Sequence, residues 1–182
     1  NLKYCPTAMI VDKLKFVNNS AFSCYNEITN KFMKIHFVCS GNTFRSRLAE
    51  SYLKSKNIPS LEVSSSGIAA EQNLNGPIAW YAMRIIKNNG LVNFMSGSWQ
   101  QTTKELIERN DLVIFMKKSH YDFCRDFLAP SQKYLIWNIE DIEGIISPAL
   151  EKEIENIKKS EEIYNSIKNK VDLLEFSIRN QN

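Results

Sequence analysis

The segment "HFVCSGNTFRSRLAES", residues 36–51, joins an apolar run to a helical pattern through a turn of small and polar residues. The apolar run, "KIHFVC" (34–39), is short and rich in β-branched and aromatic residues, which favours a buried strand. The following "SRLAESYLKSKN" (46–57) carries its apolar residues at three-and-four spacing, which predicts a helix. A strand, a tight turn and a helix in immediate succession are typical of a fold in which the two elements alternate.

The rest of the chain continues this alternation. Three further apolar runs predict strands, at 60–67, 111–116 and 133–139. Helical patterns lie at 77–89, 103–108 and 119–128, and the tail after 148 carries a stripe of helical period that predicts one long helix or two nearly collinear ones. We therefore predict right-handed crossovers and a three-layer α/β/α fold with a four-stranded parallel sheet. Ligands bind such sheets beyond the carboxyl ends of their strands, where residues 39–46 must lie.

Length and composition indicate one domain and exclude several classes of protein. A chain of 182 residues suffices for one sizeable core, and an apolar content of 43% is too high for a disordered chain. The net charge of +3 is mild and the charges are interspersed, so we expect no nucleic-acid partner. No apolar run approaches the roughly eighteen residues of a membrane span, and no secretory leader is recognisable. We therefore expect a cytoplasmic protein without membrane insertion.

The cysteines and histidines stand far apart along the chain. They form neither a Cys-x-x-Cys pair nor a histidine pair at metal-ligand spacing, so we expect reduced thiols, no metal and no cofactor. These residues are Cys5, Cys24, Cys39, Cys124, His36 and His120.

Residues 1–32 fit the alternating pattern poorly. They contain one apolar cluster, "AMIV" at 8–11, which suits an added arm, a partner-binding segment or a partly disordered stretch. We therefore divide the chain into an N-terminal extension of unknown role (1–32) and an α/β domain (33–182).

The turn after the first predicted strand has the composition of an anion site. A loop of small residues and a helix N-terminus aim backbone N–H groups and a positive dipole end into one concavity. Cys39 lies at its mouth, where the same field favours the nucleophilic thiolate, and Ser46 is placed to donate to its sulfur. Arg45 offers two donors to one phosphate, while Gly41 and Asn42 allow a tight turn. The weaker alternative is a cysteine that merely ends a buried strand, with the arginine on a solvated helix face.

This loop, "FVCSGNTFRS", resembles the signature Val-Cys-x-Gly-Asn-x-x-Arg-Ser of the low-molecular-weight protein tyrosine phosphatases. The resemblance continues through "AES" (49–51), "SSGI" (65–68), "NNG" (88–90) and "NDLVIFM" (110–116). It implies the family's four-stranded parallel sheet with the phosphate-binding loop after the first strand. It also implies roles for single residues: Cys39 as nucleophile, Arg45 as phosphate clamp, Asn42 as loop organiser and Ser66 as the hydrogen-bonding partner of Asn42. The phosphate-binding residues would be Ser40, Gly41, Asn42, Thr43, Phe44, Arg45 and Ser46.

Several positions depart from the family's pattern. Phe44 stands where the family commonly has a second cysteine, and Arg47 replaces the usual proline. The family's general acid is an aspartate in an Asp-Pro pair, and the best match is Asp141 in "WNIEDIEGI", which no proline follows. Glu140 and Glu143 remain alternatives as the acid, and all three carboxylates would also suit an acidic surface loop.

The residues and the resemblance together predict a protein phosphatase that hydrolyses phosphomonoesters of phosphorylated protein through a phosphocysteine intermediate. Asp141 would protonate the leaving group and then activate water. One alternative is a binding module that holds phosphate without turnover. Another is an arsenate reductase, which needs further cysteines to relay a disulfide, and Cys124 alone, with none between 40 and 123, disfavours it.

We expect phosphotyrosine as the first-choice substrate and phosphoarginine as its competitor. Tyrosine-directed members of the family line a slot with aromatic side chains, but the corresponding stretches, "IAAEQNLNG" (68–76) and "DIEGIIS" (141–147), contain none. Thr43 is a second indication, because "GNT" resembles the loop of the family's protein arginine phosphatases. Aromatic residues from elsewhere, namely Phe44, Trp80 or Trp99, would keep the slot suited to tyrosine.

Overall fold

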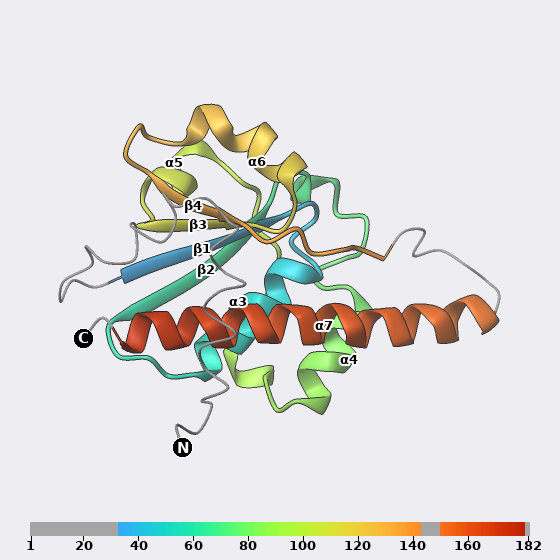
Figure 1. The fold of residues 1–182 in the computed structure, drawn as a ribbon. Coiled ribbons are helices and arrows are strands. Elements are labelled where there is room, and N and C mark those ends of the chain that lie inside the picture. Colours follow the sequence, from blue (N-terminus) through green and yellow to red (C-terminus); the bar gives the residue numbers. More distant parts are fainter. Residues whose placement is uncertain (1–32, 143–149, 181–182) are drawn as a thin grey trace, which may run out of the picture.

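The computed structural model describes residues 33–142 and 150–180, and its centre is a sheet of four parallel strands (Figure 1). In the order β2-β1-β3-β4, the strands comprise Leu61–Gly67, Met33–Cys39, Leu112–Phe115 and Lys133–Ile136. The register between β1 and β2 places Cys39 opposite Gly67. The two strands therefore end side by side at the carboxyl edge, from which the loop of residues 40–44 leaves.

Helices cover both faces of the sheet, as the sequence predicted. On one face lie α3 (Arg45–Ser55), α4 (Trp80–Asn88) and the long α7 (Leu150–Arg179), and on the other lie α5 (Lys104–Glu108) and α6 (Lys118–Cys124) (Figure 1). Short 3-10 helices are formed by Ala70–Gln72 (η1), Val92–Phe94 (η2) and Arg125–Phe127 (η3). The predicted three-layer fold is confirmed.

Two apolar cores hold the layers together because successive strand residues face opposite sides of the sheet. Ile35 and Phe37 of β1 are fully buried in the larger core, beneath α3, α4 and α7. Val38 of β1 and Val113 of β3 are fully buried in the smaller core, beneath α5 and α6. The apolar stripe of α7 joins the larger core through Ile163, Tyr164, Ile167, Val171, Leu174 and Ile178.

The structure shortens some predicted elements. The last strand ends at Ile136, before Asn138 turns into the left-handed region with φ 52°. The helix predicted from 77 begins at Trp80, because Ala79 is still extended with ψ 137°.

The tail forms one helix of 30 residues rather than two. Within the described ranges no helix is both long and apolar enough to cross a membrane.

Three predictions fall wholly or partly on residues outside the described ranges. They concern the N-terminal extension (1–32), Glu143 as an alternative acid, and the reduced state of Cys5 and Cys24.

Candidate active site

The loop between β1 and α3 makes a sharp turn, and the end of β2 with the residues directly after it packs against its backbone. Asn42 adopts a left-handed conformation with φ 52°, as its residue type allows. Gly67 at the end of β2 lies directly against the loop, since a Cβ there would come within 2.5 Å of the Ser40 carbonyl oxygen and 2.6 Å of the Asn42 nitrogen. The backbone N–H groups of Ile68 and Ala69 donate to the carbonyls of Cys39 and Ser40 at 3.0 and 2.9 Å.

The Cys39 sulfur lies at the N-terminus of α3, and two polar groups form hydrogen bonds with it. The side chain is buried, and the Asn42 backbone N–H donates to Sγ at 3.2 Å. The Ser46 hydroxyl lies 3.0 Å from Sγ, as the sequence predicted. Because Asn42 Nδ2 donates to Ser46 Oγ at 2.9 Å, the hydroxyl proton of Ser46 is available to the sulfur. This environment stabilises negative charge on sulfur.

Asn42 organises the loop through its side chain. Its Nδ2 also donates to Ser65 Oγ at 2.7 Å, and its Oδ1 accepts from the backbone N–H of Gln100 at 2.8 Å. The prediction that Ser66 would be the partner of Asn42 is wrong. The Ser66 hydroxyl faces the other side of the sheet, where it lies 2.7 Å from His36 Nε2. Neighbouring strand residues point to opposite faces, so a shift of one residue exchanges the two serines.

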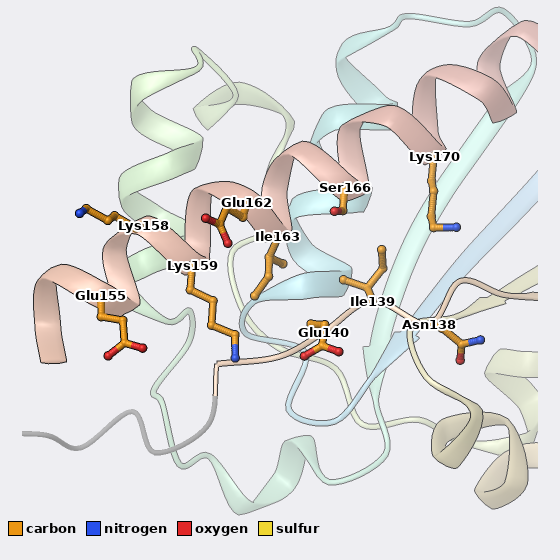
Figure 2. A pocket seen from close by; sticks show the side chains of 10 residues that line it. All are labelled: Asn138, Ile139, Glu140, Glu155, Lys158, Lys159, Glu162, Ile163, Ser166 and Lys170. Carbon is orange, nitrogen blue, oxygen red and sulfur yellow. The ribbon is translucent and has the colours of Figure 1, made fainter. Parts of the chain in front are cut away.

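Arg45 and Asp141 form an ion pair at the edge of the loop. The Arg45 guanidinium is 2% exposed and donates to the Ile139 carbonyl at 3.1 Å, while a second nitrogen contacts Asp141 Oδ2. The Asp141 side chain is 29% exposed. Of the described acidic candidates, Asp141 lines the pocket above Cys39, whereas Glu140 lines a different hollow of about 600 Å³ against α7 (Figure 2).

The pocket above the loop has a volume of about 160 Å³. Phe44 is the one aromatic residue among the described residues that line it, so neither Trp80 nor Trp99 contributes to its wall. The lining residues that lie outside the loop are aliphatic or polar. The lining comprises Cys39, Ser40, Gly41, Thr43, Phe44, Arg45, Ala69, Ala70, Gln72, Leu74, Asn75, Asp141 and Ile142.

A buried charged group beneath the loop was not predicted. Arg47 is fully buried and donates to the carbonyls of Ser96 and Ser98. Burial lowers its pKa, and the nearby Glu50 carboxylate opposes this effect. Glu50 in turn accepts a hydrogen bond from Ser65, the partner of Asn42. The one signal in the sequence was that Arg47 stands where the resembled family has proline.

His120 is a second residue near the site to which the sequence assigned no role. Its Nε2 lies 3.0 Å from Ser40 Oγ, although 80 residues separate the two in sequence. Burial, together with the positive charges of Arg45 and Lys117, lowers the pKa of His120 to about 3. No group of three or more metal-ligating side chains occurs within the described ranges.

Comparison with known proteins agrees with this geometry. Residues 34–176 match the family model described as low molecular weight phosphotyrosine protein phosphatase. A protein-arginine-phosphatase of Geobacillus stearothermophilus is 34% identical over 89 residues, which span 49% of this chain and 57% of the relative. Arsenate reductase 1 of Staphylococcus haemolyticus is 28% identical over 125 residues, or 69% of this chain and 89% of the relative. The structure of Vibrio vulnificus Wzb in complex with benzylphosphonate has a TM-score of 0.55 and 27% identity, and the match covers 76% of this chain and 99% of Wzb.

Proposed function

The chain belongs to the low molecular weight phosphotyrosine protein phosphatase family, and we propose that it hydrolyses phosphomonoesters of phosphorylated proteins through a phosphocysteine intermediate. The observation that carries this proposal is the position of Cys39. Its sulfur accepts from the loop backbone and lies beside the Ser46 hydroxyl, and the ion pair of Arg45 and Asp141 borders the same pocket. Candidate nucleophile, anion-binding groups and an acidic side chain thus face one small space.

In the first step the Cys39 thiolate attacks phosphorus. The bond from phosphorus to the leaving oxygen breaks, the electron pair goes to that oxygen, and Asp141 supplies its proton. The loop amides and Arg45 hold the equatorial oxygens, whose charge is spread in the transition state. Arg45 suits this role because its planar guanidinium can contact two oxygens at once.

In the second step water hydrolyses the phosphocysteine. The Asp141 carboxylate takes a proton from the water, the water oxygen bonds to phosphorus, and the electron pair of the sulfur–phosphorus bond returns to Cys39. Ser46 lies 3.0 Å from the sulfur and stabilises it as a leaving group. Inorganic phosphate is released, and no metal takes part in either step.

The decisive experiment measures how fast the full chain turns over an activated aryl phosphate such as para-nitrophenyl phosphate. We expect turnover by the wild-type protein, loss of turnover in Cys39→Ser, and a phosphocysteine trapped by acid quench during turnover. A wild-type protein that binds phosphate without turnover would instead be the phosphate-binding module, and turnover that survives Cys39→Ser would exclude the cysteine mechanism.

Phosphotyrosine remains our first choice of substrate residue, and phosphoarginine is the second candidate. The second is favoured by the pocket wall, in which Gln72 and Asn75 offer hydrogen-bonding groups to a guanidinium while Phe44 alone offers a ring. Thr43 also lines the pocket. Specificity constants on matched phosphotyrosine and phosphoarginine peptides separate the two candidates. A preference for phosphoarginine that reverses in Thr43→Ile would overturn our first choice.

Cys124, the other cysteine that the structure describes, gives no support to arsenate reduction. Cys124 is fully buried in the smaller core, on the opposite face of the sheet from α3, and burial raises its pKa to about 12. A thiol in this environment is a poor relay for a disulfide. We place the phosphatase in the cytoplasm, because the proposed mechanism needs Cys39 in its reduced form.

A further inference from the structure

Ser40, the first residue after the nucleophile, carries a hydroxyl group for which the proposed chemistry has no role so far. Its side chain is exposed and lines the pocket. Two nitrogen atoms approach its Oγ: His120 Nε2 at 3.0 Å and an Arg45 guanidinium nitrogen at 3.4 Å. The orientation of the Ser40 hydroxyl therefore depends on the protonation of His120.

The tautomer of His120 follows from its other ring nitrogen. The backbone N–H of Lys117 donates to Nδ1 at 3.0 Å, so Nδ1 carries a lone pair. The side chain is 2% exposed, and burial next to Arg45 and Lys117 keeps the imidazole neutral. The single ring proton of a neutral imidazole then lies on Nε2, which faces Ser40.

The Ser40 hydroxyl consequently receives hydrogen bonds on its protein side. His120 donates to Oγ, and so does Arg45 over a longer distance. No described residue accepts from the Ser40 hydroxyl, so its proton is free to point into the pocket. Arg45 also contacts Asp141, so Ser40 lies on the side of the pocket where the leaving oxygen would be protonated.

We propose that Ser40 donates a side-chain hydrogen bond to a phosphoryl oxygen, and that His120 acts as a positioning residue that fixes the direction of this hydroxyl. The inference rests on the proposed function in one respect, because both concern the same phosphoryl group. It adds a donor that the loop backbone does not supply. His120 contacts no substrate and acts through Ser40.

Binding of inorganic phosphate, measured by calorimetry at pH 7, tests the donor separately from turnover. Ser40→Ala should weaken phosphate binding by about tenfold, the lower end for a hydrogen bond to a charged group. Ser40→Thr keeps a hydroxyl and should recover most of that loss. Ser119→Ala, which removes an exposed hydroxyl from α6, is the matched control. Unchanged binding in Ser40→Ala would overturn the proposal, whatever the His120 variants do.

Two substitutions of His120 separate its contact with Ser40 from its contact with Lys117. Asparagine can accept from the Lys117 N–H but cannot reach Ser40, whereas glutamine can donate to Ser40 but gives up the acceptor for Lys117. We expect His120→Asn to weaken phosphate binding as Ser40→Ala does, and His120→Gln to retain binding while melting at a lower temperature. Phosphate binding that falls in step with thermal stability in the two variants would mean that His120 is merely structural.

The double variant Ser40→Ala, His120→Asn tests whether the histidine acts through the serine. Its loss of phosphate binding should equal that of Ser40→Ala alone, since the same interaction is removed twice. Losses that multiply would show an independent role for His120 and overturn the positioning claim. If the wild-type protein binds phosphate in a Ser40-dependent way but turns over no phosphate ester, the proposed function fails while this inference stands.

Discussion

Substitution of Gly67 by alanine should displace the phosphate-binding loop. The added Cβ would lie 2.5 Å from the Ser40 carbonyl oxygen, about 0.9 Å short of an ordinary contact. All three of its nearest atoms belong to the loop backbone, so no side chain can rotate away to relieve the contact. The strand cannot easily retreat either, because the Gly67 N–H donates to Gln100 and its carbonyl accepts from Thr102, each at 2.9 Å.

The substitution should lower both activity and stability. A shift of this size in a catalytic loop costs on the order of 10²-fold in kcat, because the reacting groups lose their alignment. Overpacking of a buried site costs about 1–3 kcal/mol of unfolding free energy. Steady-state turnover of an aryl phosphate and urea denaturation give the two numbers.

Gly97→Ala is the matched control for this substitution. A Cβ at Gly97 would meet no atom within 4 Å, and its backbone needs no left-handed conformation. We expect this variant to keep wild-type kcat and stability. If Gly67→Ala kept wild-type kcat as well, the loop would tolerate displacement, and the claim that β2 sets the geometry of the nucleophile would be refuted.

Three further predictions concern the acid, the clamp and the buried histidines. Asp141→Asn should slow substrates with poor leaving groups far more than activated aryl phosphates, which barely need the proton. Arg45→Lys should lose most of the activity although it keeps the charge, because an ammonium cannot contact two oxygens in one plane. His36 and His120 both have pKa values lowered to about 3, mainly by burial. Below about pH 6.5 the unfolded chain therefore binds more protons than the folded protein. The stability they contribute is complete above that pH and is lost as pH falls toward 3, by about 2 kcal/mol for each histidine between pH 7 and 5.

Each of these predictions has an outcome that would contradict it. Equal losses on good and poor leaving groups would leave Asp141 a structural role. Wild-type turnover in Arg45→Lys would mean that Arg45 is not the clamp. For the histidines, urea denaturation at pH 7 and pH 5 should show a smaller difference in His36→Asn than in the wild-type protein, and an unchanged difference would place the acid sensitivity elsewhere.

The elements that bear the candidate site were predictable because their signals are local. A β-branched run, a glycine and an asparagine, and then apolar residues at helical spacing predicted β1, the turn and α3 to within two residues. The contact of Ser46 with the Cys39 sulfur was predictable for the same reason, since seven residues separate the two. Local pattern was sufficient where the chain folds back on itself within one strand-loop-helix unit.

Contacts from other elements were harder to predict, and Ser65 illustrates the reason. Near its carboxyl end β2 is buried on both faces, so its burial does not alternate and "SSS" carries no sign of which serine faces α3. His120 poses a related difficulty. Its place beside Ser40 depends on how α6 packs against the end of the sheet, which no spacing along the chain expresses.

Arg47, which stands where the family commonly has proline, helps to support the site. Where proline would make no polar contact, the Arg47 guanidinium binds the carbonyls of Ser96 and Ser98 and so fixes the segment that follows them. That segment supplies the Gln100 N–H, which donates to Asn42 Oδ1 at 2.8 Å. Since the backbone N–H of Asn42 in turn donates to the Cys39 sulfur, the buried arginine supports the loop through two intervening contacts.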